Sequence, residues 1–204
     1  MNDCIQKLEA TGDYRIIKRF KPVSSYLQDN DANKKIGIFL DTETTGLDSD
    51  SDRIIELAMV PFEFDANGHI YRLLPEYNSL NDPGKPIPAI VTQLTGITDE
   101  MVKGQSINLV SVKNLLADAV IVIAHSARFD RPFCENLLDE FKDISWGCSV
   151  ADINWQEEGM EGRKLEYLAS YRYGFFLKGI APQLIVRLGS KSIRVPYSTP
   201  AILP

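Results

Sequence analysis

Three acidic residues follow two short apolar runs, and their placement is the strongest chemical signal in the chain. Asp41 and Glu43 come directly after the apolar run 36–40, and Asp130 comes shortly after the apolar run 120–123. Each run predicts a buried strand. Carboxylates at the end of a buried strand are costly unless a positive partner lies beside them. Because carboxylate oxygens are the ligands that hard divalent cations prefer, the pattern predicts a metal ion at this place.

The spacing of these acids indicates the chemistry that such a site would support. Asp41 and Glu43 are two positions apart on an expected strand, so both side chains point to the same face of the sheet. Several carboxylates can hold two divalent ions, and two such ions can activate a water and stabilise the leaving oxygen in phosphodiester cleavage. The pair alone would indicate only a solvated strand end. Together with the Thr-Thr-Gly-Leu that follows it and the second acidic segment, it indicates a nuclease-type site.

The elements that must position these acids are predicted to form a mixed α/β sheet. Strands are expected at 36–41, 53–64, 70–74, 120–124 and 144–150. The first three form an antiparallel meander with a turn at Asn67-Gly68, and 120–124 lies parallel beside 36–41. Helices are expected at 5–10, 88–94, 99–102, 108–119, 131–141 and 163–173, with a loop at 75–88. Three meandering strands followed by alternating helices and strands are typical of a mixed α/β fold.

Composition limits the classes of function. The net charge of −6 argues against broad, charge-driven coating of nucleic acid, but it allows a pocket that grips a few nucleotides. The three cysteines include no Cys-x-x-Cys pair, which argues against a zinc knuckle and suits a reducing compartment. The N-terminus does not resemble a signal peptide, and no apolar run is long enough to cross a bilayer. The sequence therefore predicts a cytoplasmic protein with no membrane partner.

With these motifs in place, the chain resembles the DEDD-type (DEDDh) 3′–5′ exonucleases, which include the epsilon proofreading subunit of bacterial DNA polymerase III. The resemblance rests on residues 39–47, 94–101 and 123–130, which match two family motifs and the Gly-Ile-Thr segment between them. It covers 36–179 and implies an RNase H-like fold, with a mixed five-stranded sheet and flanking helices. Residues 1–35 would then be an N-terminal extension and linker, and 180–204 an irregular tail.

The resemblance also implies a reaction, cofactors and residue roles. It implies two Mg²⁺ or Mn²⁺ ions, release of nucleoside monophosphates from the 3′ end of single-stranded DNA or RNA, and a DNA polymerase as a candidate partner. Asp41 would bridge both ions, Glu43 would hold the ion on the nucleophile side, and Asp130 would hold the other. Four further residues are expected beside the terminal nucleotide or supporting it: Thr44, Leu47, His125 and Phe129. For His125, a packing role and a direct catalytic role both stay open.

The third family motif is missing from this sequence. The family ends its site with a His, or a Tyr in one branch, and an Asp, but here no Asp follows Asp152 and no His follows His125. One inserted base after Gly179 would let the codons of 180–186 encode His-Arg-Ala-Thr-Ala-Asp-Cys, which restores a His and an Asp at the family spacing. We therefore consider a one-nucleotide frameshift, which reading the gene at this point would test.

The missing motif leaves three functional hypotheses. The first is a 3′–5′ exonuclease by lineage that is impaired in this chain, because a general base and one metal-binding carboxylate are absent. The second is a non-catalytic nucleic-acid-binding or polymerase-binding module that retains the exonuclease fold. The third is a phosphatase of the aspartyl-phosphate type, which Glu43 and the lack of an evident downstream Lys motif disfavour.

Overall fold

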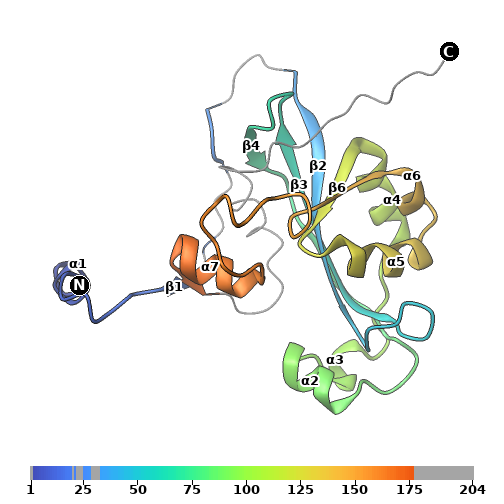
Figure 1. The fold of residues 1–204 in the computed structure, drawn as a ribbon. Helices are drawn as coiled ribbons and strands as arrows, with labels where there is room; N and C mark the ends of the chain where they lie inside the picture. The colour runs from blue at the N-terminus through green and yellow to red at the C-terminus, as the bar shows by residue number, and fades with distance from the viewer. Residues whose placement is uncertain (1, 20, 22–24, 29–32, 177–204) are drawn as a thin grey trace.

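The computed structural model describes residues 2–19, 21, 25–28 and 33–176 (Figure 1). Its helices are α1 (Asn2–Ala10), α2 (Ala89–Thr95), α3 (Asp99–Val102), α4 (Leu109–Asp118), α5 (Ala127–Leu137), α6 (Glu140–Asp143) and α7 (Leu165–Tyr173). Its strands are β1 (Lys18–Arg19), β2 (Lys35–Thr44), β3 (Ile54–Phe64), β4 (Ile70–Leu73), β5 (Tyr77–Leu80), β6 (Ala119–Ala124), β7 (Ser145–Cys148) and β8 (Phe175–Phe176). The predicted α/β class is confirmed.

One mixed sheet organises the fold. Its strands follow the order β4-β3-β2-β6-β7, in which β2, β3 and β4 are antiparallel neighbours and β6 runs parallel to both β2 and β7. The predicted meander and the parallel placement of β6 beside β2 are therefore confirmed. This arrangement matters for the site, because the carboxyl ends of β2 and β6 meet at the same end of the sheet.

The predicted loop at 75–88 is partly wrong, because β5 lies within it. β5 pairs antiparallel with residues 56–59 of β3, so the sheet has six strands and not the five that were predicted. β3 is 11 residues long, and β4 pairs only with its far end, Phe62–Phe64. The backbone groups of residues 56–59 on the same edge of β3 also need hydrogen-bond partners, and β5 supplies them. No local sequence pattern reveals this need.

The core has a layer on each face of the sheet. Helices α4, α5 and α6 cover one face (Figure 1), where residues of the strands and helices form a single cluster. Its largest fully buried members include Ile38, Leu40, Met59 and Phe141. On the opposite face, the Phe39 and Phe62 rings stack with their centroids 4.1 Å apart. Gly37 makes this stacking possible, because a Cβ atom there would lie 2.4 Å from Cζ of Phe62.

The helix predicted at 131–141 is wrong in its bounds. Helix α5 begins four residues earlier, at Ala127, and ends at Leu137, while Phe141 belongs to the separate helix α6. Pro132 lies inside the helix, close to its N-terminal end, where Pro is tolerated. The shift has a consequence for the site, because it places Asp130 in the first turn of α5.

A second, small parallel sheet of β1 and β8 joins the N-terminal segment to the end of α7. The Arg15 guanidinium lies 4.8 Å from the centre of the Tyr171 ring and donates hydrogen bonds to the carbonyls of Ser170 and Tyr171. The N-terminal segment thus contacts the last described helix. The predicted N-terminal extension and linker at 1–35 lies partly, and the predicted tail at 180–204 wholly, outside the described residues. The domain boundaries at 35/36 and 179/180 stay predictions.

Candidate active site

The three predicted acids gather at the carboxyl ends of two parallel strands. β2 carries Asp41 and Glu43, and β6 ends at Ala124, two residues before the first turn of α5 that holds Asp130. All three side chains line one pocket of about 700 Å³. The structure thus brings together carboxylates that are far apart in the sequence, because parallel pairing of β2 with β6 aligns the ends of both strands.

Two further carboxylates line the same pocket. Glu56 lies directly opposite Glu43 in the antiparallel register of β2 and β3, and Glu166 comes from the first turn of α7. Among the described residues that line the pocket, Lys164 carries the only permanent positive charge. Five carboxyl groups and one ammonium group make this pocket strongly acidic.

Burial raises the pKa of all three predicted metal ligands. For Asp41 the pKa lies well above the usual range, because burial is reinforced by the charges of Asp130 and Glu43. Burial, Glu56 and Asp130 together raise the pKa of Glu43 to about 7. Burial raises the pKa of Asp130 to about 6, against the opposing effect of hydrogen bonds from Thr42. A cluster of buried oxygen donors with so little positive charge fits a cation.

Thr42 orients Asp130. The backbone N–H of Thr42 and its hydroxyl both donate to Oδ1 of Asp130, at 3.1 and 2.7 Å. One carboxylate oxygen is therefore held by protein donors, while Asp130 still lines the pocket.

Across the described residues, no three His, Cys, Asp or Glu side chains stand close enough together to form a ready-made metal-binding group. The oxygen donors of Asp41, Glu43 and Asp130 are of the chemical type that a divalent cation prefers, although these side chains are not arranged as a ready-made site.

His125 links the end of β6 to the segment before α7. Its Nε2 lies 2.8 Å from the carbonyl oxygen of Arg163, and its Nδ1 lies 2.7 Å from Oγ of Ser149. A carbonyl oxygen can only accept, so Nε2 carries the proton, and Nδ1 accepts from the Ser149 hydroxyl. Burial lowers the pKa of His125, which keeps the ring neutral and suits this arrangement. Both ring nitrogens are therefore engaged in positioning the chain.

The other predicted nucleotide-side residues fall into two groups. Leu47 and Phe129 line the pocket together with the carboxylates, and Leu47 is 86% exposed. Leu94, from α2, lies on the same pocket and is 78% exposed. Thr44 is buried and is not among the residues that line the pocket; its hydroxyl donates to the Gly46 carbonyl at 2.6 Å. The structure thus places Leu47 and Phe129 at the pocket and Thr44 beneath the neighbouring loop.

Several residues that line the pocket were not predicted from the sequence, among them Glu56, Leu94, Lys164 and Glu166. Glu56 had a detectable signal, because it is the single charged residue in the otherwise apolar run 54–60. The other three lie on helices or at a helix start, where exposed residues follow no chemical pattern. Only the packing of α2 and α7 near the end of β2 reveals them.

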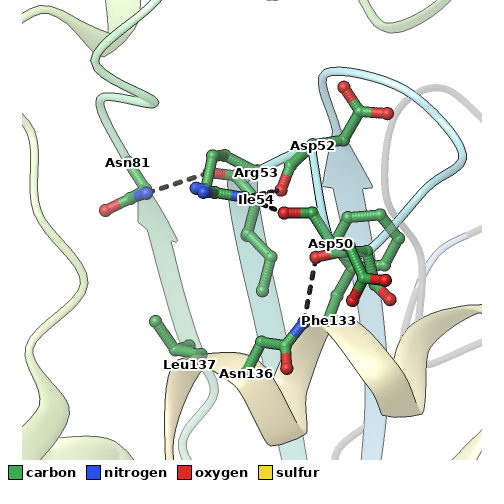
Figure 2. A pocket seen from close by; sticks show the side chains of 9 residues that line it. Asp50, Asp52, Arg53, Ile54, Asn81, Phe133, Asn136 and Leu137 are labelled. Carbon is green, nitrogen blue, oxygen red and sulfur yellow. Dashed lines mark hydrogen bonds between the residues drawn. The ribbon is translucent and has the colours of Figure 1, made fainter.

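A second pocket, of about 450 Å³, lies beside the loop that carries Leu47 (Figure 2). In this pocket Nδ2 of Asn136, on α5, donates to the Ser49 carbonyl at 2.9 Å. Arg53 donates to the carbonyls of Asp50 and Asp52 at 3.2 and 2.6 Å. These contacts tie the loop after Gly46 to α5 and to the start of β3. The polar groups here hold the loop in place and so help to position Leu47.

Comparison with known proteins identifies the family. The exonuclease family model RNase_T matches residues 38–153, which is more than half of the chain. The chain belongs to this exonuclease family. The match runs from β2 to just beyond β7, and so includes Asp41, Glu43 and Asp130. The resemblance to DEDD-type 3′–5′ exonucleases is thereby confirmed, and the family supports a nuclease function.

Relatives of this chain include much larger proteins. The PolC-type DNA polymerase III of Listeria welshimeri is 43% identical over 96 residues, which are 46% of this chain and 6% of that protein. The PolC-type DNA polymerase III of Halalkalibacterium halodurans is 40% identical over 100 residues, which are 47% of this chain and 6% of that protein. The chain thus spans only a small part of these relatives.

Solved structures show the same fold. E. coli exonuclease I in complex with a 5cy-dA13 oligonucleotide has a TM-score of 0.55, with 16% identity, over 74% of this chain and 39% of that chain. Its complex with a dA16 oligonucleotide has a TM-score of 0.54, with 16% identity, over 79% of this chain and 42% of that chain. The predicted RNase H-like fold is confirmed. In the described part of the chain, no helix has the length and apolar character needed to span a membrane.

Proposed function

We propose that the chain is a metal-dependent 3′–5′ exonuclease by lineage, which releases nucleoside monophosphates from the 3′ end of single-stranded DNA or RNA. The observation that carries this proposal is the gathering of Asp41, Glu43 and Asp130 in one pocket at the carboxyl ends of β2 and β6. These residues would hold Mg²⁺ or Mn²⁺, two ions in an intact site. When bound, such ions supply an activated water and stabilise the leaving oxygen.

The residues of the chain itself would bind and orient the substrate. The side chains of Leu47 and Leu94 are largely exposed on the pocket and offer apolar contacts to a terminal base. Phe129 packs against Phe133, with ring centroids 5.2 Å apart, and supports the first turn of α5. Thr42 holds one oxygen of Asp130, which fixes the orientation of that carboxylate. Single-stranded oligonucleotides bound to E. coli exonuclease I agree with a substrate of this class.

The missing third motif sets the expected level of activity. No His follows His125 and no Asp follows Asp152, so a general base and a fourth metal-binding carboxylate of the family pattern are absent from the sequence. Loss of a general base alone typically lowers a rate 10²- to 10⁴-fold. We therefore expect weak hydrolysis, which Mn²⁺ supports better than Mg²⁺ because Mn²⁺ binds such sites more tightly.

Digestion of a single-stranded DNA labelled at its 3′ end tests this function. The chain is incubated with Mn²⁺ or Mg²⁺ beside the Asp41→Ala variant and beside a version in which the reading frame after Gly179 is restored. We expect slow release of mononucleotides from the chain, none from Asp41→Ala, and much faster release from the frame-restored version. Equal rates for the chain and the frame-restored version would contradict the assignment of the general base to the lost segment.

The absent third motif also favours a second candidate, a nucleic-acid-binding or polymerase-binding module that retains the fold. The match to PolC-type polymerases is compatible with such a role. Binding of single-stranded DNA without any metal-dependent hydrolysis, under conditions in which the frame-restored version cleaves, would favour the binding module over the impaired enzyme.

A further inference from the structure

We propose that Lys164 contacts a phosphate of the bound nucleic acid and that His125 positions the segment that carries Lys164. This inference rests on the proposed nuclease function and extends it. Lys164 lines the same pocket as Asp41, Glu43 and Asp130. It follows directly after Arg163, whose carbonyl oxygen is held by His125.

The charge of the pocket creates a need for this contact. Its lining contains five carboxyl groups, from Asp41, Glu43, Glu56, Asp130 and Glu166, and a single permanent cation, from Lys164. A nucleic acid strand brings one negative charge per nucleotide into this acidic surface. Divalent ions would compensate the deepest acids. Beyond them, Lys164 is the described side chain of the pocket that can attract a phosphate.

The ammonium group of Lys164 is available for a ligand. Over the part of the chain that the structure describes, no hydrogen bond or ion pair engages its side chain, which is exposed. Lys164 also stands at the N-terminal end of α7, a helix of 9 residues whose first turn has no side-chain cap. The free backbone N–H groups and the helix dipole at this end favour negative charge and act in the same direction as the ammonium.

His125 supplies the link between this segment and the site. Its Nε2–H donates to the Arg163 carbonyl at 2.8 Å, and its Nδ1 accepts from Ser149 at 2.7 Å. Ser149 is 2% exposed, and its carbonyl accepts a hydrogen bond from Nε1 of Trp155 at 2.8 Å. The start of α7 is therefore connected through His125 to the end of β6, and His125 is itself anchored to the buried Ser149. In this role His125 acts on the substrate through Lys164.

The test measures the affinity for a 3′-ended oligo-dT by fluorescence anisotropy at several salt concentrations, with Ca²⁺ as the divalent ion. Each phosphate contact to a single strand contributes about 0.7 to the slope of log K against log salt. Lys164→Ala should lower the slope by about this amount. When the salt concentration rises from about 50 to 200 mM, the affinity of the wild type should then fall about 2- to 3-fold more than the affinity of the variant. Lys164→Arg should keep the slope.

The matched control is Lys113→Ala, because Lys113 lies on α4 and pairs with Glu140 away from the pocket. His125→Phe keeps an aromatic ring and removes both hydrogen bonds, and it should lower the slope as Lys164→Ala does. The double variant should show no further decrease of the slope, since both changes remove the same phosphate contact. If His125→Phe does not fold by circular dichroism, Ser149→Ala, which loosens the same link, replaces it.

Each outcome decides the proposal. An unchanged slope in Lys164→Ala, with normal binding by the wild type, overturns the phosphate contact and leaves the nuclease function standing. Additive losses in the double variant overturn the positioning role of His125. A wild-type chain that binds no oligo-dT at any salt concentration overturns the inference and the proposed function together.

Discussion

Replacing Glu43 by Gln should stabilise the protein at alkaline pH in the absence of divalent ions. Burial and the charges of Glu56 and Asp130 raise the pKa of Glu43 from 4.5 to about 7. The folded protein therefore holds the proton of Glu43 more tightly than the unfolded chain, and its stability falls as pH rises from about 4.5 to about 7. This loss of unfolding free energy is complete above about pH 7 and absent below about pH 4.5, which is the pKa of Glu43 in the unfolded chain.

The magnitude follows from the same values. A rise of the pKa from 4.5 to about 7 corresponds to at most about 3 kcal/mol of unfolding free energy. The carboxyl is partly exposed, so screening by solvent reduces the expected effect to about 1–2 kcal/mol. Glu43→Gln keeps the shape of the side chain without its charge. It should therefore be more stable than the wild type by this amount at pH 8, and the difference should be much smaller at pH 5.

The assay is urea unfolding with EDTA at both pH values. The comparison of the variant with the wild type cancels the titration of groups that both share. Glu157→Gln, at an exposed position, is the control and should leave the stability difference between the two pH values unchanged. The reasoning fails if Glu43→Gln shows no gain at pH 8, or if the gain is as large at pH 5. Adding Mn²⁺ should then stabilise the wild type more than the variant, because the cation removes the repulsion that Glu43 creates.

Two further predictions concern the framework of the site. Thr42→Val removes the hydroxyl that donates to Asp130 and should lower the unfolding free energy by about 1–3 kcal/mol at pH 8. Urea unfolding measures this change, and an unchanged midpoint would show that this hydrogen bond does not stabilise the fold. Gly37→Ala places a methyl group 2.4 Å from Cζ of Phe62 and should cost about 1–3 kcal/mol by thermal unfolding. Gly147→Ala, whose nearest contact is 3.3 Å, should cost less, and the reverse order would contradict the packing argument.

Several parts of this protein could be predicted from local sequence patterns. The apolar runs before Asp41 and Asp130 predicted strands β2 and β6, because a short apolar run bounded by polar residues has little choice of structure. The period of two along β2 placed Asp41 and Glu43 on one face. The family follows from the same motifs, since catalytic acids and their neighbours are adjacent in sequence. The missing third motif is likewise a property of the sequence alone.

Other features depend on contacts between distant segments, which no local pattern records. β5 exists because β4 leaves residues 56–59 of β3 without partners. Glu56 joins the site through its register opposite Glu43, and one residue of slip would turn it to the other face. Lys164 reaches the pocket because His125 holds the preceding carbonyl. The sequence by itself predicted which acids could bind a cation, whereas the tertiary structure decided which other charges face them, because electrostatic interactions depend on distance in space.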